Sequence, residues 1–228
     1  MRRLALAAAL CLTVAALASL GVWQLQRRAW KHALIEQVDR RLAAAPIPAP
    51  GPEMWPGITA ANAYTRITAH GLLRTDRQTK VQAVTRIGPG FWVMAPLETD
   101  RGFTLIVNRG FVPQDGQDSA PQPPLPATIS GLLRVSEPGG AFLRSNRPAE
   151  DRWYSRDVAA IAAKRSLAGA VAPYFVDADA APGGGWPRGG LTIVSFPDNH
   201  MQYALTWFAM AALLAATGIG MAWRGRRR

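Results

Sequence analysis

Two long apolar segments, one near each end, constrain the fold of this chain most. Residues 4–23 and 201–223 carry no charged side chain. As a helix, the second segment is about 34 Å long at about 1.5 Å per residue, which exceeds a hydrocarbon core of about 30 Å. Tyr203, Trp207 and Trp223 lie near its two ends, as is typical of residues at membrane–water interfaces. The sequence therefore predicts two transmembrane helices.

The first segment also has features of a cleavable signal peptide. Arg2 and Arg3 precede it, and the small residues Ala16 and Ala18 resemble a cleavage site. However, the apolar run continues beyond Ala18 as far as Leu25. This continuation favours a retained anchor.

The two apolar segments also separate the charged residues of the chain into terminal and central groups. The net charge is +11, and six of the 26 basic residues lie at the two ends, outside the apolar segments, whereas all 15 acidic residues lie between them. The region between therefore has 20 basic against 15 acidic residues, a net charge of +5. No clustered basic stripe with stacking aromatic residues is found in the sequence, so we expect no nucleic-acid partner.

The basic ends also predict the orientation in the membrane. By the positive-inside rule, both termini are cytoplasmic and the central region lies on the other side. Arg27, Arg28 and Lys31 oppose this assignment on the outer flank. The long segment that follows is nevertheless expected to be translocated largely regardless of its charge.

The central region has the patterns of a small β domain. Alternating or short apolar runs predict strands at residues 64–73, 80–85, 91–97, 103–111, 128–135, 173–177 and 191–196. The fourth of these follows the third closely enough for a hairpin. Asp157 is placed to cap a helix over residues 158–167, and the proline-rich residues 113–126 are expected to form an exposed loop.

The predicted class is an α+β membrane protein, in which two transmembrane helices flank a mainly antiparallel β outer domain with a minor helix. We expect an N-terminal transmembrane helix at residues 1–26 and a juxtamembrane helix with an extended proline-rich linker at residues 27–53. The β domain is expected at residues 54–197, followed by the second transmembrane helix at 198–223 and a basic tail at 224–228.

Enzymatic chemistry is not indicated. The sequence has no Gly-x-Ser-x-Gly elbow, and neither His32 nor His70 lies in a catalytic motif. The lone Cys11 falls within the first apolar segment, so no Cys-x-x-Cys site can form. The paired acids Asp177 and Asp179 stand in a polar, glycine-rich context and are expected to be solvated.

His200 is the exception, because it begins the second apolar segment. In helical phase His200, Tyr203 and Trp207 lie along one side. The imidazole is either an ordinary interfacial residue or an axial ligand to a haem iron in aromatic surroundings. A copper site would be incomplete, with one histidine, the adjacent Met201 and no cysteine on the outer side.

The helix that leaves the first segment carries a second candidate stripe. Leu20, Trp23, Arg27 and Trp30 recur at spacings of three and four, which places two indoles and a guanidinium on one face. An aromatic belt with snorkelling cations explains this pattern. Alternatively, Arg27 or Arg28 faces an anionic group at the membrane surface.

Four segments together resemble a known family. They are LGVWQLQRRAWK from Leu20, VNRGFVP from Val107, GLLR from Gly131 and DNHMQYALTWF from Asp198, in this order and between two apolar segments. The chain resembles the surfeit locus protein 1 family, the assembly factors of cytochrome c oxidase. It departs from the family pattern at Asp198, where Asn is common, at Phe111, where Trp is frequent, and at Met201, where Leu is frequent.

The resemblance implies a two-span protein of the bacterial inner (cell) membrane whose central domain is periplasmic. It implies transient binding of haem a, with His200 as the candidate iron ligand and Tyr203, Trp207, Trp23 and Arg27 as further binding residues. The implied partners are the catalytic first subunit of the oxidase and the enzymes that synthesise haem a. For Asn108, Arg109 and Gly110, a structural role at a strand end is at least as consistent as binding. A haem-independent scaffold for the oxidase subunit remains the alternative.

Overall fold

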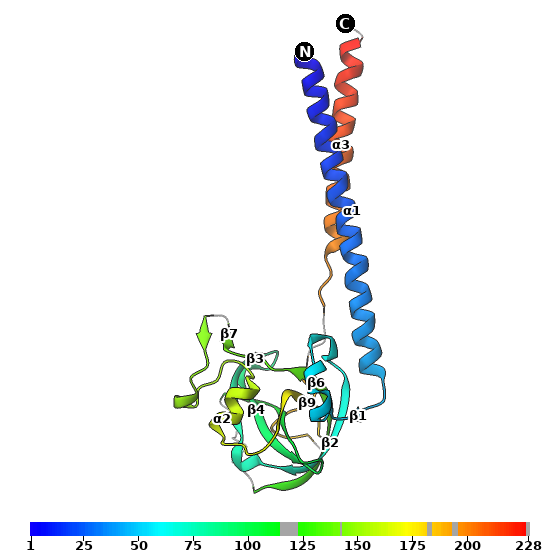
Figure 1. Cartoon of the computed structure of the whole chain (residues 1–228). Coiled ribbons are helices and arrows are strands. Elements are labelled where there is room, and N and C mark those ends of the chain that lie inside the picture. The colour runs from blue at the N-terminus through cyan, green and yellow to red at the C-terminus, as the bar shows by residue number, and fades with distance from the viewer. Residues whose placement is uncertain (115–122, 142, 182–183, 193–195, 227–228) are drawn as a thin grey trace. The chain divides into compact units, whose positions relative to one another are not determined.

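The computed structural model describes residues 1–114, 123–141, 143–181, 184–192 and 196–226. The chain divides into two compact units (Figure 1). The first contains residues 1–37 and 194–228, and the second contains residues 38–193. The long helix α1 (Arg2–Ala43) contributes to both.

The helical unit pairs α1 with α3 (His200–Arg226). Both helices are long and apolar enough to cross a membrane, with mean hydropathies of 2.3 and 1.7 in their apolar windows. Very little of either window is buried inside the protein. The predicted α+β membrane class, with two apolar helices flanking a sheet domain, is therefore confirmed.

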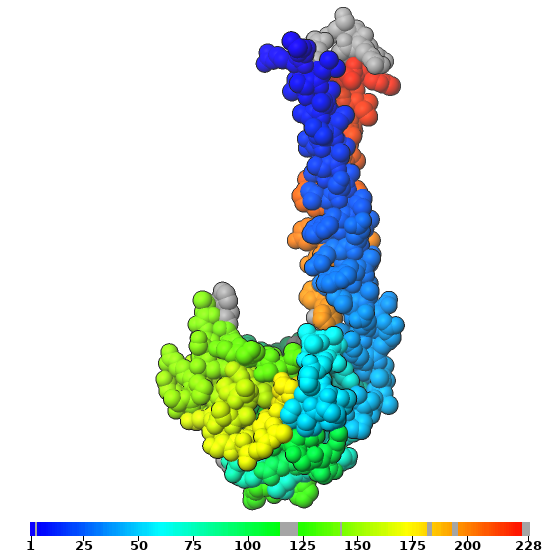
Figure 2. Space-filling view, in the orientation of Figure 1, coloured from blue at the N-terminus to red at the C-terminus, as the bar shows by residue number. Residues whose placement is uncertain are grey.

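The two helices meet along a seam with a coiled-coil repeat. On α1 the side chains shielded from solvent recur at alternating spacings of four and three residues: Leu10, Val14, Leu17, Gly21, Gln24, Arg28, Lys31 and Ile35. On α3 the corresponding residues are His200, Ala204, Trp207, Ala211, Leu214 and Gly218. A repeat of seven residues keeps one face of each helix against its partner. Figure 2 shows α1 in blue packed along α3 in orange and red.

Close contacts define the direction of this pairing. A Cβ atom at Gly21 would lie 2.5 Å from the ring of Phe208, and one at Gly218 would lie 2.3 Å from Leu10. The start of α1 therefore lies beside the end of α3, so the helices run antiparallel. Glycine at position 21 lets the aromatic ring approach the α1 backbone.

The second unit is built on one sheet. Its strands are β1 (Ile47–Pro48), β2 (Arg66–Leu73), β3 (Thr79–Thr85), β4 (Gly88–Thr99), β5 (Thr104–Pro113), β6 (Leu125–Val135) and β9 (Val171–Ala178). The strand order is β1-β2-β6-β9-β5-β4-β3, with an additional β2–β4 pairing. The pairs β1–β2 and β5–β9 are parallel and the others antiparallel.

Smaller elements complete this unit. They are β7 (Gly140–Ala141), β8 (Arg144–Ser145), the short helix α2 (Val158–Lys164) and the 3-10 turns η1 (Pro52–Gly57), η2 (Ala60–Asn62), η3 (Thr75–Arg77) and η4 (Pro148–Glu150). As predicted, the Asp157 side chain caps α2 by accepting a hydrogen bond from the backbone N–H of Ala160.

The β2–β4 pairing closes five strands into a barrel. β2, β6, β9, β5 and β4 each pair with two others of this set, because the end of β4 returns to the end of β2. A small closed barrel forces its strands close together at some points. A Cβ atom at Gly131 of β6 would lie 2.1 Å from the carbonyl oxygen of Asp177 on β9. Glycine at this position permits the close approach.

Apolar residues separate into two cores. The first fills the barrel, where Tyr174, Leu105, Leu97 and Val107 are fully buried. The second lies against the outer face of the sheet and includes Met94, Ile106, Phe175 and Trp153, together with Val158 and Ile161 of α2. Strands buried on both faces explain why runs such as residues 103–111 lack a clear polar alternation.

Several sequence predictions need correction. The loop predicted over residues 113–126 is too long, because β6 already begins at Leu125 and Pro126 pairs with Leu72. β9 pairs with β6 only from Gly131 onward, so this part of β6 has an unpaired edge that tolerates a residue without an N–H. Residues 115–122 of that loop lie outside the described residues.

The last predicted strand is also wrong in part. Leu191, Thr192 and Phe196 are not in a strand, and residues 193–195 lie outside the described residues. Conversely, the proline-rich linker is extended as predicted but belongs to the sheet, since Ile47 and Pro48 pair with β2 and Ala49 is buried.

We expect Gly131→Ala to lower the free energy of unfolding by about 2 kcal/mol or more, because the new methyl group collides with the β9 backbone. Thermal or chemical unfolding of the full chain in detergent measures this change. Gly57→Ala is the matched control, because a Cβ atom there has no neighbour within 4 Å. Equal stability of both variants would contradict the tight barrel closure.

Candidate functional site

His200 lies at the first position of α3 and faces the seam. Its Nδ1 atom lies 2.7 Å from the side-chain oxygen Oε1 of Gln24 on α1. Because an amide oxygen can only accept, the imidazole donates its Nδ1–H. In the neutral ring, Nε2 then carries the lone pair. Among the described residues, none forms a hydrogen bond with that atom.

A charged cap holds the start of α3 next to this imidazole. Asp198 accepts a hydrogen bond of 3.0 Å from the backbone N–H of His200. Its Oδ2 lies 2.7 Å from Nε2 of His32 and 3.5 Å from Nε of Arg28, both on α1. Lys31 donates a hydrogen bond to the carbonyl oxygen of Pro197. The polar residues of the first segment thus fasten the entry of the second helix.

These contacts change the pKa of Asp198. The hydrogen bond from the His200 backbone N–H is the largest effect and lowers the pKa of Asp198, and the contact with His32 lowers it further. An Asn, the residue that the family resemblance leads one to expect at this position, could accept the same backbone bond. The aspartate adds an ion pair that an amide cannot make.

The other predicted site residues do not all gather at His200. Trp207 is partly shielded, but the Tyr203 and Trp23 side chains are 56% and 53% exposed. The guanidinium of Arg27 stacks over the ring of Trp30 at 4.1 Å and has no carboxylate partner among the described residues. Arg28, in contrast, is paired with Asp198.

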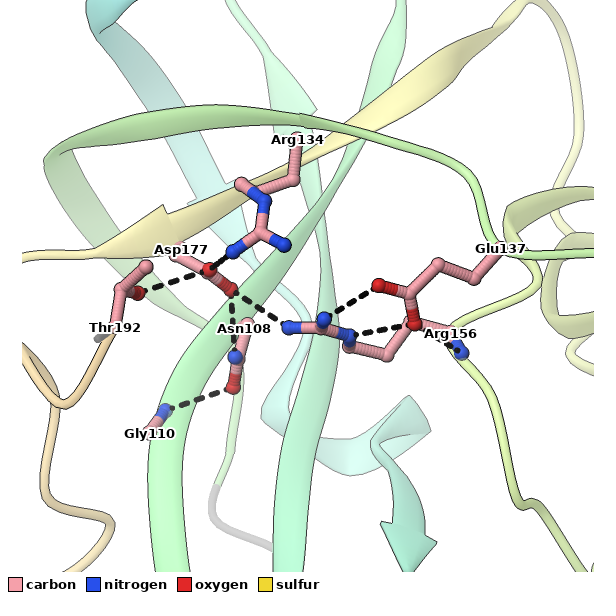
Figure 3. Close-up of polar contacts among 7 residues, drawn as sticks. All are labelled: Asn108, Gly110, Arg134, Glu137, Arg156, Asp177 and Thr192. Atoms are coloured by element: carbon pink, nitrogen blue, oxygen red, sulfur yellow. Dashed lines mark hydrogen bonds and ion pairs between the residues drawn. The ribbon is translucent and has the colours of Figure 1, made fainter. Parts of the chain in front are cut away.

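A second polar cluster lies in the wall of the barrel around Asp177 of β9 (Figure 3). Its Oδ1 accepts hydrogen bonds from Asn108 at 2.7 Å and Arg156 at 3.4 Å. Its Oδ2 accepts from Arg134 at 2.8 Å and Thr192 at 2.9 Å. The residue is only 4% exposed, so four donors compensate for the loss of water.

Arg156 extends this cluster to a second acid. It donates to Glu137 through Nε at 3.0 Å and Nη2 at 2.5 Å. Burial alone would lower the pKa of Arg156, but the bonds to Glu137 and the charge of Asp177 raise it above its ordinary value. Two arginines therefore balance two carboxylates in a closed network.

This cluster corrects the expectation that Asp177 is solvated. Asp179, its neighbour, is more exposed and pairs with Arg66 at 2.5 Å. Asn108 has a structural role, since its amide binds Asp177 and its Oδ1 accepts from the Gly110 backbone N–H at 3.1 Å. The contacts of Asp177 cross from β9 to β5 and β6, which a local sequence pattern does not reveal.

Gln24 was not predicted as a site residue from the sequence. It stands between Trp23 and Arg27, which drew attention as an aromatic and cationic stripe. The pattern that could have identified it is its spacing of three residues from Gly21 and four residues from Arg28. This spacing defines the face of α1 that meets α3.

Comparisons with known proteins show which family the sequence matches. The SURF1 family model matches residues 11–212. Surfeit locus protein 1 of Mus musculus is 34% identical over 222 residues, covering 85% of this chain and 68% of the mouse protein. The Homo sapiens protein is 31% identical, covering 85% and 69%, and a SURF1-like protein of Monosiga brevicollis is 30% identical, covering 92% and 84%.

The fold and the site define a membrane protein with a β-barrel domain between two apolar helices and a histidine at the start of the second helix. The length of the match and the identities extend this class to a family. The chain belongs to the surfeit locus protein 1 (SURF1) family of cytochrome c oxidase assembly factors.

We expect Asp177→Ala to destabilise the protein by about 3–5 kcal/mol, because it leaves Arg134 without its buried carboxylate and Arg156 with only Glu137. Unfolding of the full chain in detergent provides the measurement. Asp179→Ala removes a more exposed carboxylate from the same strand end and should cost about 1 kcal/mol or less. Similar losses for both variants would refute the buried network.

The pKa of Asp198 should lie below the ordinary value of 3.8. Because the folded-state pKa is depressed, the stabilisation from this carboxylate is present above the unfolded value and lost as the pH falls through the folded one. Carboxyl ¹³C NMR measures the titration. His32→Ala should raise the pKa only part of the way, since the His200 backbone N–H remains. An Asp198 pKa at or above its ordinary value in the parent protein would contradict the cap.

Proposed function

We propose that this chain is an assembly factor for haem-copper cytochrome c oxidase that binds haem a transiently through His200. In this proposal it assists insertion of haem a into the catalytic first subunit. The protein resides in the bacterial inner membrane, with both termini cytoplasmic and the barrel domain periplasmic. The observation that carries the proposal is the hydrogen bond between His200 Nδ1 and Gln24.

That hydrogen bond fits the chemistry of an iron ligand. Histidines that bind metals commonly donate their other ring N–H to an oxygen, which fixes the tautomer and the ring orientation. With Nδ1–H donated to Gln24, Nε2 of His200 has an available lone pair and no protein partner among the described residues. If haem a were bound, Nε2 of His200 would be the nitrogen available to ligate its iron.

Nearby side chains match the rest of a haem. The exposed rings of Trp23, next to Gln24, and Tyr203, within one turn of His200, offer apolar surface at the same level of the helical pair. Arg27 lies three residues beyond Gln24 and has no carboxylate partner among the described residues. A propionate could therefore be its anion, whereas Arg28 is already paired with Asp198.

Exposure of these groups suits a carrier. A protein that delivers a cofactor must release it, so ligation from an open helix face serves better than a closed cavity. The seam itself is occupied by close helix contacts, such as that of Gly21 with Phe208. The residues that would hold the haem are therefore His200 at the end of the seam and the exposed side chains next to it, Trp23 and Tyr203.

The test is the visible absorption spectrum of the detergent-purified chain, coexpressed with the enzymes that make haem a. We expect His200→Ala to lose the haem a spectrum and Gln24→Leu to weaken retention by about 10-fold to 100-fold, because the imidazole loses its orienting acceptor. His70→Ala is the matched control, because that histidine binds Thr128 on the barrel. It should retain haem at the level of the parent protein.

The same experiment separates the alternative function. If the parent protein is folded and supports oxidase assembly but contains no haem a, the chain is a haem-independent scaffold for the oxidase subunit. Unchanged haem content in His200→Ala would remove His200 as the ligand. Copper in place of haem would indicate a metal chaperone.

A further inference from the structure

A cavity of about 400 Å³ opens at one end of the barrel. Its apolar floor is formed by Leu73, Val107, Ile129 and Ala178, which all belong to or pack against the core inside the barrel. Arg109 of β5 and Trp186 also line it. The mouths of small β-barrels are common places for ligands, because the strands hold an apolar hollow open to solvent on one side.

Arg109 is unusual among the shielded arginines of this domain. Four others have side-chain exposures of 14–19%, and each pairs with a carboxylate: Arg74, Arg134, Arg156 and Arg165. Arg109 is half-buried, and among the described residues it forms no ion pair. Within the described part of the chain, its side chain donates one hydrogen bond, a long contact of 3.4 Å to Oε1 of Gln78.

A cation in this position is costly to the folded protein. Burial lowers the pKa of Arg109, because the charged guanidinium loses water without gaining an anion. The carboxylate that lines the same cavity, Asp179, is bound to Arg66 at 2.5 Å. Arg109 thus lines the cavity, and its guanidinium has no carboxylate partner among the described residues, an arrangement that an external anion would complete.

The surroundings restrict the kind of anion. The cavity has one guanidinium, and the carboxylate of Asp179 beside it repels additional negative charge. The site therefore suits a ligand with a single negative charge better than a phosphate with two. Leu73, Val107 and Ile129 offer apolar surface to the rest of the ligand, beside the hydroxyl-bearing residues Thr128 and Ser130. We propose that this cavity binds a small organic carboxylate, with its carboxylate on Arg109 and its apolar body on Leu73, Val107 and Ile129.

The test uses three probes of known structure with the full chain in detergent: hexanoate, its neutral analogue hexanamide, and acetate. Ligand-observed NMR titration gives the dissociation constants. Hexanoate should bind at least about tenfold more tightly than hexanamide, because a charge-assisted pair replaces a neutral hydrogen bond. It should also bind more tightly than acetate, because only hexanoate reaches the apolar floor.

Variants at Arg109 then assign the charge. Arg109→Gln should abolish the preference for hexanoate over hexanamide, while Arg109→Lys should retain part of it. Arg86→Gln, at an exposed arginine between β3 and β4, is the matched control and should bind as the parent protein does. These measurements do not involve haem, so the result is independent of the function proposed for His200.

A stability measurement separates this proposal from a purely structural role. Without a ligand, Arg109→Met should unfold at the same temperature as the parent protein or higher, because it removes an unpaired, partly desolvated charge. A lower unfolding temperature for Arg109→Met would assign Arg109 to the architecture of the barrel. Absence of hexanoate binding, or equal binding by the parent protein and Arg109→Gln, would overturn the proposal.

Discussion

The barrel depends on how it satisfies one buried carboxylate. Asp177 lies in the wall where β9 meets β5 and β6, and its four donors come from Asn108, Arg134, Arg156 and Thr192. An ion at this depth is tolerated only when charge and hydrogen bonds are both compensated. The network therefore couples strands that are distant in sequence and also binds Thr192, in the segment that follows the barrel strands.

The helical unit is stabilised differently from the barrel. Its apolar helices gain little from hydrophobic burial against each other in a lipid environment. Close packing takes that role where Gly21 accepts the ring of Phe208 and Gly218 accepts Leu10. The polar residues of the seam concentrate at its other end, at Gln24, Arg28 and Lys31. There they meet His200 and Asp198, so the contacts that align the helices also orient the imidazole.

The sequence predicts the elements that depend on neighbouring residues. It does not predict the features that depend on contacts between distant segments. The two apolar helices, the Asp157 cap and most strands are encoded locally by run length, capping and alternation, and these predictions were correct. The barrel closure between β2 and β4 and the burial of Asp177 arise from contacts between distant segments. Pro126 was misassigned for the same reason, because its place in a strand depends on which edge of β6 is unpaired.

The candidate site shows the same division. The spacing of apolar residues placed His200 at the helix entry, but its tautomer depends on Gln24, which is 176 positions away. A folded chain normally satisfies its shielded polar groups, as the Asp177 network does, so an exception needs a reason. Among the described residues, Nε2 of His200 has no hydrogen-bond partner and the guanidinium of Arg109 has no carboxylate partner. One is a lone pair that can bind a cation, the other a cation that can bind an anion, and they lie in different units of the chain.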